Sequence, residues 1–244
     1  MNNLVIQSLW VGSKISPIEQ LCIKSFLDNG HEFHLYVYDL NIEGCPRGTI
    51  FKDANEIIPS EDIFKDVING YTSFADWFRY NLLYERGGWW VDMDIICLKY
   101  FDMEDDYCFT TELAMDYRLP EIIVNNAVIK APKQAEFLGD MLKYMSGKDL
   151  KNSKWGEFGP RFLDRVLREF DSAPYIHPPK IFCPLNWHQV NLLFDDDLVY
   201  SLDSSFAIHL WNNIWTKHGY NKYSIYPQNS ILERLKSRYG IIDQ

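Results

Sequence analysis

The stretch "SFADWFRYNLLYERGGWWVDMDIICL", residues 73–98, decides the fold class of this chain. It predicts an amphipathic helix, a glycine stop at Gly87 and Gly88, an apolar strand, and then the pair Asp92 and Asp94. Because side chains alternate along a strand, the two aspartates are expected on one side. Ligands of α/β proteins bind at the carboxyl ends of parallel strands. The sequence therefore predicts two carboxylates at the mouth of a crevice.

Two carboxylates this close raise each other's pKa unless a cation lies beside them. Mg²⁺ and Mn²⁺ prefer oxygen ligands and commonly join carboxylates to substrate phosphates, so Asp92 and Asp94 predict a metal-dependent phosphate site. On the preceding helix, Asp76 and Arg79 share one face. They could hold sugar hydroxyls and a sugar or phosphate oxygen. The simpler interpretation makes Asp76 part of a capping box with Ser73 as N-cap, and Arg79 its ion-pair partner.

The flanking segments extend the α/β pattern. Residues 4–12 predict a strand, residues 16–30 a helix capped by Ser16, and residues 32–40 a second strand, which together indicate a βαβ unit and a parallel sheet. Residues 41–59 are expected to form a loop and residues 60–70 a short helix. Further strands are expected at 107–113, 122–131 and 204–211, and further helices at 131–147, 159–170 and 230–240. No repeat or linker interrupts the chain, so residues 1–244 are interpreted as one domain.

Composition narrows the class of protein. The chain has 244 residues, is 47% hydrophobic and carries a net charge of −10, which fits a substantial core and disfavours a nucleic-acid partner. No apolar run approaches the ~20 residues that span a bilayer. The five cysteines contain no CxxC pair and are interpreted as reduced thiols of a cytoplasmic protein. The basic residues 233–240 could contact an anionic membrane face, although a solvated helix is the simpler interpretation.

The segment "ADWFRYNLLYERGGWWVDMDIICLK" resembles the DxD-containing sugar-binding region of glycosyltransferase family 32 and its relatives. These relatives include yeast initiating mannosyltransferases, bacterial capsule and lipopolysaccharide transferases and, more distantly, the large clostridial toxin glucosyltransferases. The shared pattern is S-D-x-x-R-Y, a Leu-Tyr pair, G-G, an aromatic residue and D-x-D. Ala75 replaces the usual Ser, and Trp90 replaces the common Tyr.

The resemblance continues outside this segment and implies roles for further residues. The opening strand is similar to the family segment whose Trp-containing loop lies by the nucleotide base, and residues 122–131 resemble a strand that brings an asparagine to the donor sugar. A late segment resembles H-x-x-x-x-S-W, with Ile214 in place of the usual Ser or Gly. The implied donor-binding residues are Leu9, Trp10, Gly12, Trp90, Asn125 or Asn126, and Trp215. The implied catalytic residues are Asp76, Arg79, Asp92 and Asp94, and the implied metal ligands are Asp92, Asp94 and His209.

The resemblance implies a single GT-A domain, Rossmann-like, with a central and mostly parallel sheet flanked by helices. It also implies a retaining transferase that uses Mn²⁺ or Mg²⁺ and a nucleoside-diphosphate sugar, with UDP as the expected nucleotide. The acceptor would be a saccharide, in capsule, other surface polysaccharide or lipopolysaccharide synthesis. Two alternatives remain open: a haloacid-dehalogenase-type phosphatase with Asp92 as nucleophile and Asp94 as acid/base, and a non-catalytic sugar-binding module.

Overall fold

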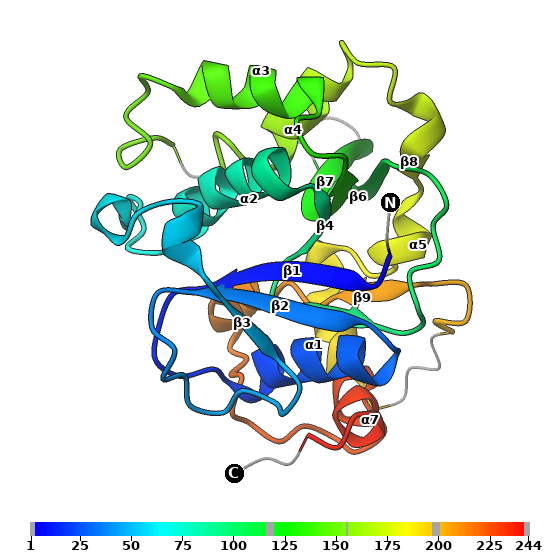
Figure 1. Ribbon diagram of the computed structural model, residues 1–244. Coiled ribbons are helices and arrows are strands. Elements are labelled where there is room, and N and C mark those ends of the chain that lie inside the picture. The colour runs from blue at the N-terminus through cyan, green and yellow to red at the C-terminus, as the bar shows by residue number, and fades with distance from the viewer. Residues whose placement is uncertain (1–2, 116–119, 155, 197–200, 242–244) are drawn as a thin grey trace.

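The computed structural model describes residues 3–115, 120–154, 156–196 and 201–241, and a seven-stranded sheet forms its centre (Figure 1). The strand order is β3-β2-β1-β4-β7-β6-β8. Strands β3, β2, β1 and β4 are parallel, and β6 and β8 are parallel, whereas β7 is antiparallel to both of its neighbours. The bounds are β1 (Val5–Trp10), β2 (Glu32–Val37), β3 (Ile50–Asp53), β4 (Gly88–Val91), β6 (Cys108–Met115), β7 (Pro120–Ala131) and β8 (Ile176–His177). The predicted α/β class with a mostly parallel sheet is confirmed.

Helices cover both faces of the sheet (Figure 1). Buried side chains form one cluster with α1 (Pro17–Asp28), α5 (Pro179–Phe182) and α7 (Ile231–Arg238), and another with α2 (Thr72–Arg86), α3 (Glu136–Met145) and α4 (Pro160–Leu167). The predicted cap of α1 is present, because the Ser16 hydroxyl accepts from Ile18 N and Glu19 returns the capping-box bond. The shorter helices are η1 (Ala54–Glu56), η2 (Ser60–Asp62), η3 (Ala173–Tyr175), η4 (Trp187–Leu193), α6 (Asn212–Trp215) and η5 (Thr216–His218).

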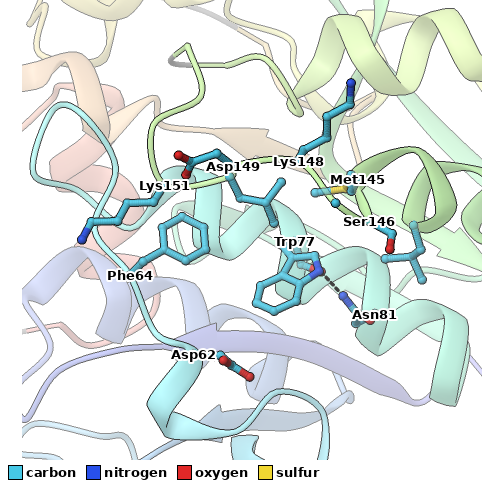
Figure 2. A pocket seen from close by; sticks show the side chains of 12 residues that line it. Asp62, Phe64, Trp77, Asn81, Met145, Ser146, Lys148, Asp149 and Lys151 are labelled. Atoms are coloured by element: carbon cyan, nitrogen blue, oxygen red, sulfur yellow. Dashed lines mark hydrogen bonds between the residues drawn. The ribbon is translucent and has the colours of Figure 1, made fainter.

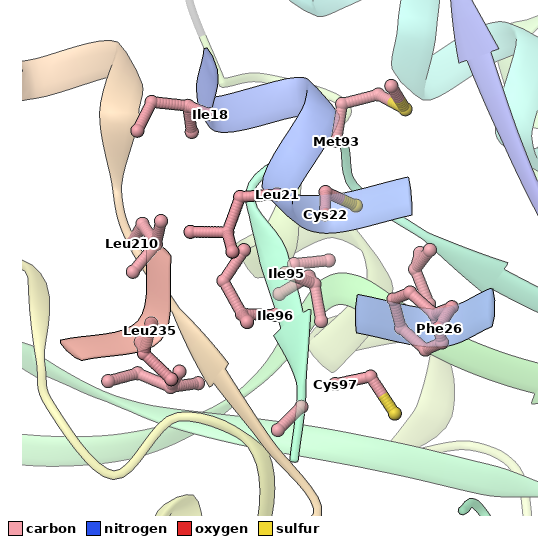
Figure 3. Packing of buried hydrophobic residues seen from close by; sticks show 14 of the residues in the cluster. Ile18, Leu21, Cys22, Phe26, Met93, Ile95, Ile96, Cys97, Leu210 and Leu235 are labelled. Atoms are coloured by element: carbon pink, nitrogen blue, oxygen red, sulfur yellow. The ribbon is translucent and has the colours of Figure 1, made fainter. Parts of the chain in front are cut away.

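A second, two-stranded sheet lies beside the first. Strand β5 (Ile95–Cys97) pairs antiparallel with β9 (Ala207–His209), and Ile95 lies opposite His209. Its apolar side chains pack against α1 and Leu235 of α7 (Figure 3). Residues 89–98 are therefore not one continuous strand: β4 ends at Val91, and the next three residues form a turn in which Ile95 N donates to Asp92 O. The expectation that strand alternation aligns the two aspartates is wrong.

The segment before α2 also differs from expectation. Only Ser60–Asp62 of the predicted helix 60–70 is helical, as a single 3₁₀ turn. The Asp66 carboxylate instead folds the loop by accepting hydrogen bonds from the backbone of Ile68, Gly70 and Ser73. Because α2 already begins at Thr72, the prediction of Ser73 as its N-cap is wrong. Strand β3 lies within residues 41–59, which were expected to form a loop only.

Gly87 is required where α2 ends. Its φ is +67°, and a Cβ at this position would lie 2.5 Å from Lys133 N. The Gly87 N–H caps the helix by donating to Leu83 O, and Gln134 N donates to Tyr84 O. The predicted glycine stop is confirmed, and the lack of a side chain lets residues 131–134 cross the end of α2. This crossing fixes where β4 starts and hence where the turn at residues 92–94 lies.

Candidate active site

After β4 the chain turns, and the side chains of Asp92 and Asp94 contact different partners. Asp92 Oδ1 accepts from Arg79 Nη2 at 2.7 Å and from Trp90 Nε1 at 2.8 Å. Asp94 Oδ2 accepts from the Asn212 backbone N–H at 2.9 Å, and Asp94 Oδ1 lies 3.2 Å from His209 Nε2. Asp92 is thereby held by α2 and β4, and Asp94 by His209 of β9 and by Asn212, which follows this strand.

The three predicted metal ligands come together. Asp92, Asp94 and His209 each offer one ligand atom, and these atoms lie within 4.8 Å of one another. Two carboxylate oxygens and an imidazole nitrogen suit a borderline-hard divalent ion such as Mn²⁺. The Asp92 side chain is 27% exposed, whereas those of Asp94 and His209 are 10% and 8% exposed. The cluster is therefore open on the side of Asp92.

The charges of this cluster are unevenly balanced. Burial would raise the pKa of Asp94, but His209, the Asn212 N–H and Lys222 together lower it. Burial opposes the charged form of His209, yet Asp94 raises the pKa of the imidazole well above its usual value. The pKa of Asp92 is raised by burial, against the effect of Arg79, and the charge of Asp94 raises it further. A divalent cation would relieve this repulsion and replace the imidazole proton.

Arg79 connects α2 to the aspartate turn and to β7. Its Nη1 donates to Asn126 O at 2.7 Å and lies 3.2 Å from Asp76 Oδ1, while Nη2 reaches Asp92. The guanidinium carbon lies 4.9 Å from the centre of the Trp90 ring, and the side chain is 4% exposed. The expected ion pair with Asp76 exists, but it is one part of a buried network that a planar fork is suited to form.

Asp76 belongs to the same network and does not cap its helix. Asp76 Oδ1 accepts from Asn126 Nδ2 at 2.8 Å, and that amide also reaches the Tyr80 hydroxyl, which donates to Phe158 O. Burial raises the pKa of Asp76 to about 6, although Arg79 opposes the shift. A Cβ on Gly159 would lie 3.5 Å from Asp76 Oδ2, so the segment before α4 passes close to this carboxylate.

The two asparagines of β7 point to different surroundings. Asn126 joins the Asp76 network, whereas Asn125 donates to the buried Glu112 and accepts from Ala127 N at 2.6 Å. Asn125 thus stabilises the irregular pairing of β6 and β7. Its amide oxygen and nitrogen are both engaged within the sheet, and Asn126 is the asparagine that lies with Asp76 and Arg79.

The predicted nucleotide-side residues are placed at and after the end of β1. Leu9 is buried in the α2 cluster, and Trp10 ends the strand. The Trp10 Nε1 atom is buried without a hydrogen-bond partner, and a Cβ on Gly12 would lie 3.3 Å from it.

Trp215 is 1% exposed in the α1 cluster, donates to Leu210 O at 2.7 Å and packs edge-on against Phe194. Its indole is enclosed by the core.

Unsatisfied polar atoms mark the same region. Across the described residues, three buried side-chain nitrogen or oxygen atoms lack a hydrogen-bond partner: Trp10 Nε1, Arg79 Nε and His209 Nδ1. Buried polar atoms are normally paired, so each exception calls for an explanation. All three belong to residues that the sequence placed in the site. The ring of His209 also has the weakly polar Cys183 thiol beside it.

Some contacts around the site were not predicted. The Asn212 backbone orients Asp94, and the Trp211 ring stacks on His209 with centroids 3.7 Å apart. Lys222 bonds to the buried Glu19 of α1 and lowers the pKa of Asp94. Asn212, Trp211 and Lys222 follow β9, whose pairing with β5 brings this part of the chain to the site. No local motif in the sequence indicates them.

Comparison with known proteins agrees with this geometry. A model described as the glycosyltransferase sugar-binding region containing the DXD motif matches residues 19–110, and a model of the alpha 1,4-glycosyltransferase conserved region matches residues 130–240. No curated protein sequence matches significantly. The first match contains Asp92 and Asp94, and the second contains His209. The cluster is therefore built from both matched regions.

Two solved structures show the same fold. The glycosyltransferase GlyE of Streptococcus pneumoniae is 13% identical, with a TM-score of 0.53 over 98% of this chain and 60% of that one. The ligand-free glycosyltransferase domain from the YGT toxin is 9% identical, with a TM-score of 0.50 over 72% of this chain and 79% of that one. The predicted resemblance and GT-A fold are confirmed. The chain is a glycosyltransferase with a DXD-type sugar-binding region.

Proposed function

We propose that the chain is a metal-dependent, retaining glycosyltransferase that moves a sugar from a UDP donor to a saccharide acceptor in surface polysaccharide or lipopolysaccharide synthesis. The observation that carries the proposal is the cluster of Asp92, Asp94 and His209, whose ligand atoms lie within 4.8 Å of one another. Next to this cluster, Arg79 holds Asp92 from a buried network that includes Asp76. The proposed cation ligands and the proposed sugar-binding groups thus lie together at the carboxyl end of β4, an interior strand of the sheet.

The three cluster residues would hold Mn²⁺ or Mg²⁺, which when bound supplies positive charge to the leaving diphosphate. Arg79 keeps Asp92 in place and supplies a buried positive charge of its own. Asp76, fixed by Asn126 and Arg79, accepts hydrogen bonds from hydroxyls of the donor sugar. The unpaired Trp10 Nε1 provides a donor for a carbonyl oxygen of the base. Because these groups are fixed before substrate arrives, little reorganisation is needed during transfer.

Hydrolysis of nucleotide sugars in the absence of acceptor tests the proposal. A panel of UDP-, GDP- and ADP-sugars is incubated with Mn²⁺ or with chelator, and nucleotide release is followed. We expect release from a UDP-sugar only with metal. Calorimetry should show tighter UDP binding with Mn²⁺ than with chelator, and equal affinity in both would contradict the metal's role. The anomeric configuration of the transferred sugar, read by NMR, tests retention.

The phosphatase alternative requires Asp92 to act as a free nucleophile. Asp92 Oδ1 is instead held by Arg79 and Trp90, and both matched regions are glycosyltransferase regions. Phosphate release from simple phosphomonoesters, without hydrolysis of any nucleotide sugar, would favour the phosphatase.

In the described part of the chain, no helix is long and apolar enough to cross a bilayer. The basic side chains of α7 are partly engaged internally. Lys236 is 2% exposed, and Arg238 donates to Leu98 O. These contacts leave α7 with less free positive charge than its sequence indicates.

A further inference from the structure

A cavity of about 560 Å³ lies on the far side of α2 from the aspartates, between the loop that precedes this helix and the segment that follows α3 (Figure 2). Its volume is within the ~300–1,000 Å³ of typical small-molecule sites. The side chains used in the argument below are Asp62, Phe64, Trp77, Asn81, Lys148 and Asp149.

The cavity and the active site share one helix but use different faces of it. Trp77 and Asn81 are four residues apart, so they lie one above the other, and Asn81 Nδ2 donates to Trp77 O. Asp76, one residue before Trp77, points about 100° away and bonds to Asn126 of β7. Trp77 of the cavity and Asp76 of the active site both lie in the N-terminal half of α2. Arg79, two residues after Trp77, points about 160° away from it and bonds to Asp92, so α2 lies between the cavity and the aspartate cluster.

The apolar part of the cavity offers two half-buried aromatic rings. The centroids of Phe64 and Trp77 are 6.4 Å apart and their planes differ by 32°, so the rings lie side by side as a shallow wall (Figure 2). The negative face of an aromatic ring attracts weakly positive C–H groups. The axial C–H face of a pyranose presents such groups, while its hydroxyls point outward. The Asn81 amide can then bond to hydroxyls at the edge of the wall.

The charges that line the cavity cancel. Asp62 and Asp149 supply two negative charges, and Lys148 and Lys151 supply two positive ones. The Lys148 ammonium lies 4.9 Å from the centre of the Tyr144 ring, which directs part of its charge away from the cavity. A phosphate or a uronic acid would find no net attraction in this lining. A neutral ligand with apolar faces and many hydroxyls matches it.

We propose that this cavity is a subsite for a neutral oligosaccharide, which holds the acceptor chain by Trp77 and Phe64 at a distance from the bond being formed. The proposal rests on the glycosyltransferase function proposed above, and it adds to that function a second binding site and a charge preference. The subsite increases the affinity for longer acceptors and leaves hydrolysis of the donor alone unchanged, because no cavity residue contacts the aspartate cluster.

Indole N–H signals of the intact protein, labelled with ¹⁵N-tryptophan, report on both sites. Signals of Trp77 and Trp10 are assigned with Trp77→Phe and Trp10→Phe. Neutral trisaccharides (maltotriose, cellotriose, mannotriose and chitotriose) and the acidic trigalacturonic acid are titrated in. We expect a neutral trisaccharide to shift Trp77 and leave Trp10 in place, and UDP with diamagnetic Mg²⁺ to shift Trp10. If no neutral sugar shifts Trp77 at millimolar concentration, or if the acid binds more tightly, the proposal is overturned.

Variants separate the subsite from the donor site. Trp77→Leu should weaken binding of the neutral trisaccharide at least tenfold, and Asn81→Ala, which removes a smaller side chain, provides a second variant with less effect on packing. Trp187→Leu, in the other core cluster, should bind like wild type. Donor hydrolysis is measured on every variant. Unchanged sugar binding in folded Trp77→Leu and Asn81→Ala would refute the subsite. A shifted Trp77 signal without hydrolysis of any donor would retain the subsite and refute the proposed transferase reaction.

Discussion

Replacing Asp94 by Asn should remove nearly all catalysis and leave the fold in place. The amide oxygen can still accept the Asn212 N–H that Asp94 Oδ2 accepts at 2.9 Å, so the turn keeps one of its two anchors. The ion pair with His209 is lost, but burial alone favours the neutral imidazole, so His209 can release its proton. The loss of stability should therefore be that of one charged hydrogen bond, about 1.5–3 kcal/mol. Loss of a preorganised electrostatic partner costs ~10²–10³ in rate, which is about 2.7–4 kcal/mol.

Hydrolysis of the UDP-sugar over a Mn²⁺ titration measures this effect, with circular dichroism as the folding control. Asp28→Asn is a matched control, because Asp28 pairs with Lys24 at the exposed end of α1. We expect this control to match wild type at every metal concentration. A folded Asp94→Asn protein with wild-type rates would refute the role of Asp94 in metal binding, and the proposed mechanism with it.

Three further substitutions test the neighbouring groups. Asp92→Asn should also reduce hydrolysis, but excess Mn²⁺ should rescue it better than Asp94→Asn, since Asp92 is the more exposed ligand; equal rescue would argue against different roles. Asp76 has a pKa of about 6 against an ordinary 3.8, so its carboxylate becomes protonated as pH falls through 6. We therefore expect the rate of donor hydrolysis to fall over the same pH range. Between pH 3.8 and about 6, Asp76 stays protonated in the folded state but ionises in the unfolded state, so the free energy of unfolding decreases as the pH rises through this range. Asp76→Asn should lose activity and both pH dependences, and an unchanged turnover would return Asp76 to a structural role. Arg79→Lys should lose at least one charged hydrogen bond, about 1.5–3 kcal/mol or at least tenfold in kcat/KM, because one ammonium cannot span partners held by two nitrogens; a wild-type kcat/KM would contradict this.

Elements with strong local signals were predictable from the sequence. The cap at Ser16 and the glycine stop at Gly87 depend on backbone bonds a few residues apart, and both are present. The cap of α2 was misplaced because Asp66, seven residues before Ser73, takes the carboxylate role assigned to Asp76. Loop folding of this kind leaves no periodic pattern in the sequence.

The candidate site was predicted through residue types more than through geometry. Two aspartates in an apolar segment indicated a cation, and the family resemblance supplied His209, which now lies 3.2 Å from Asp94. The predicted cause of this arrangement, alternation along one strand, is wrong: a turn after β4 and the pairing of β5 with β9 orient the two aspartates. Contacts from residues distant in the chain, such as Asn212 to Asp94, follow from strand pairing and have no local sequence signal. The selection of Asn126 over Asn125 likewise depends on the irregular register of β6 and β7.

The pairing of β5 with β9 also sets when the protein can become active during its synthesis. The Asn212 N–H that orients Asp94 belongs to a residue 118 positions later in the chain. At ~5–20 residues per second, a ribosome needs roughly 6–24 s to add that length. During this interval the nascent chain carries the aspartates without His209, so the proposed metal site is incomplete and the proposed reaction is not expected. Once β9 joins, the proposed metal would stabilise the folded state by linkage and would connect two segments that lie more than 100 positions apart in the chain.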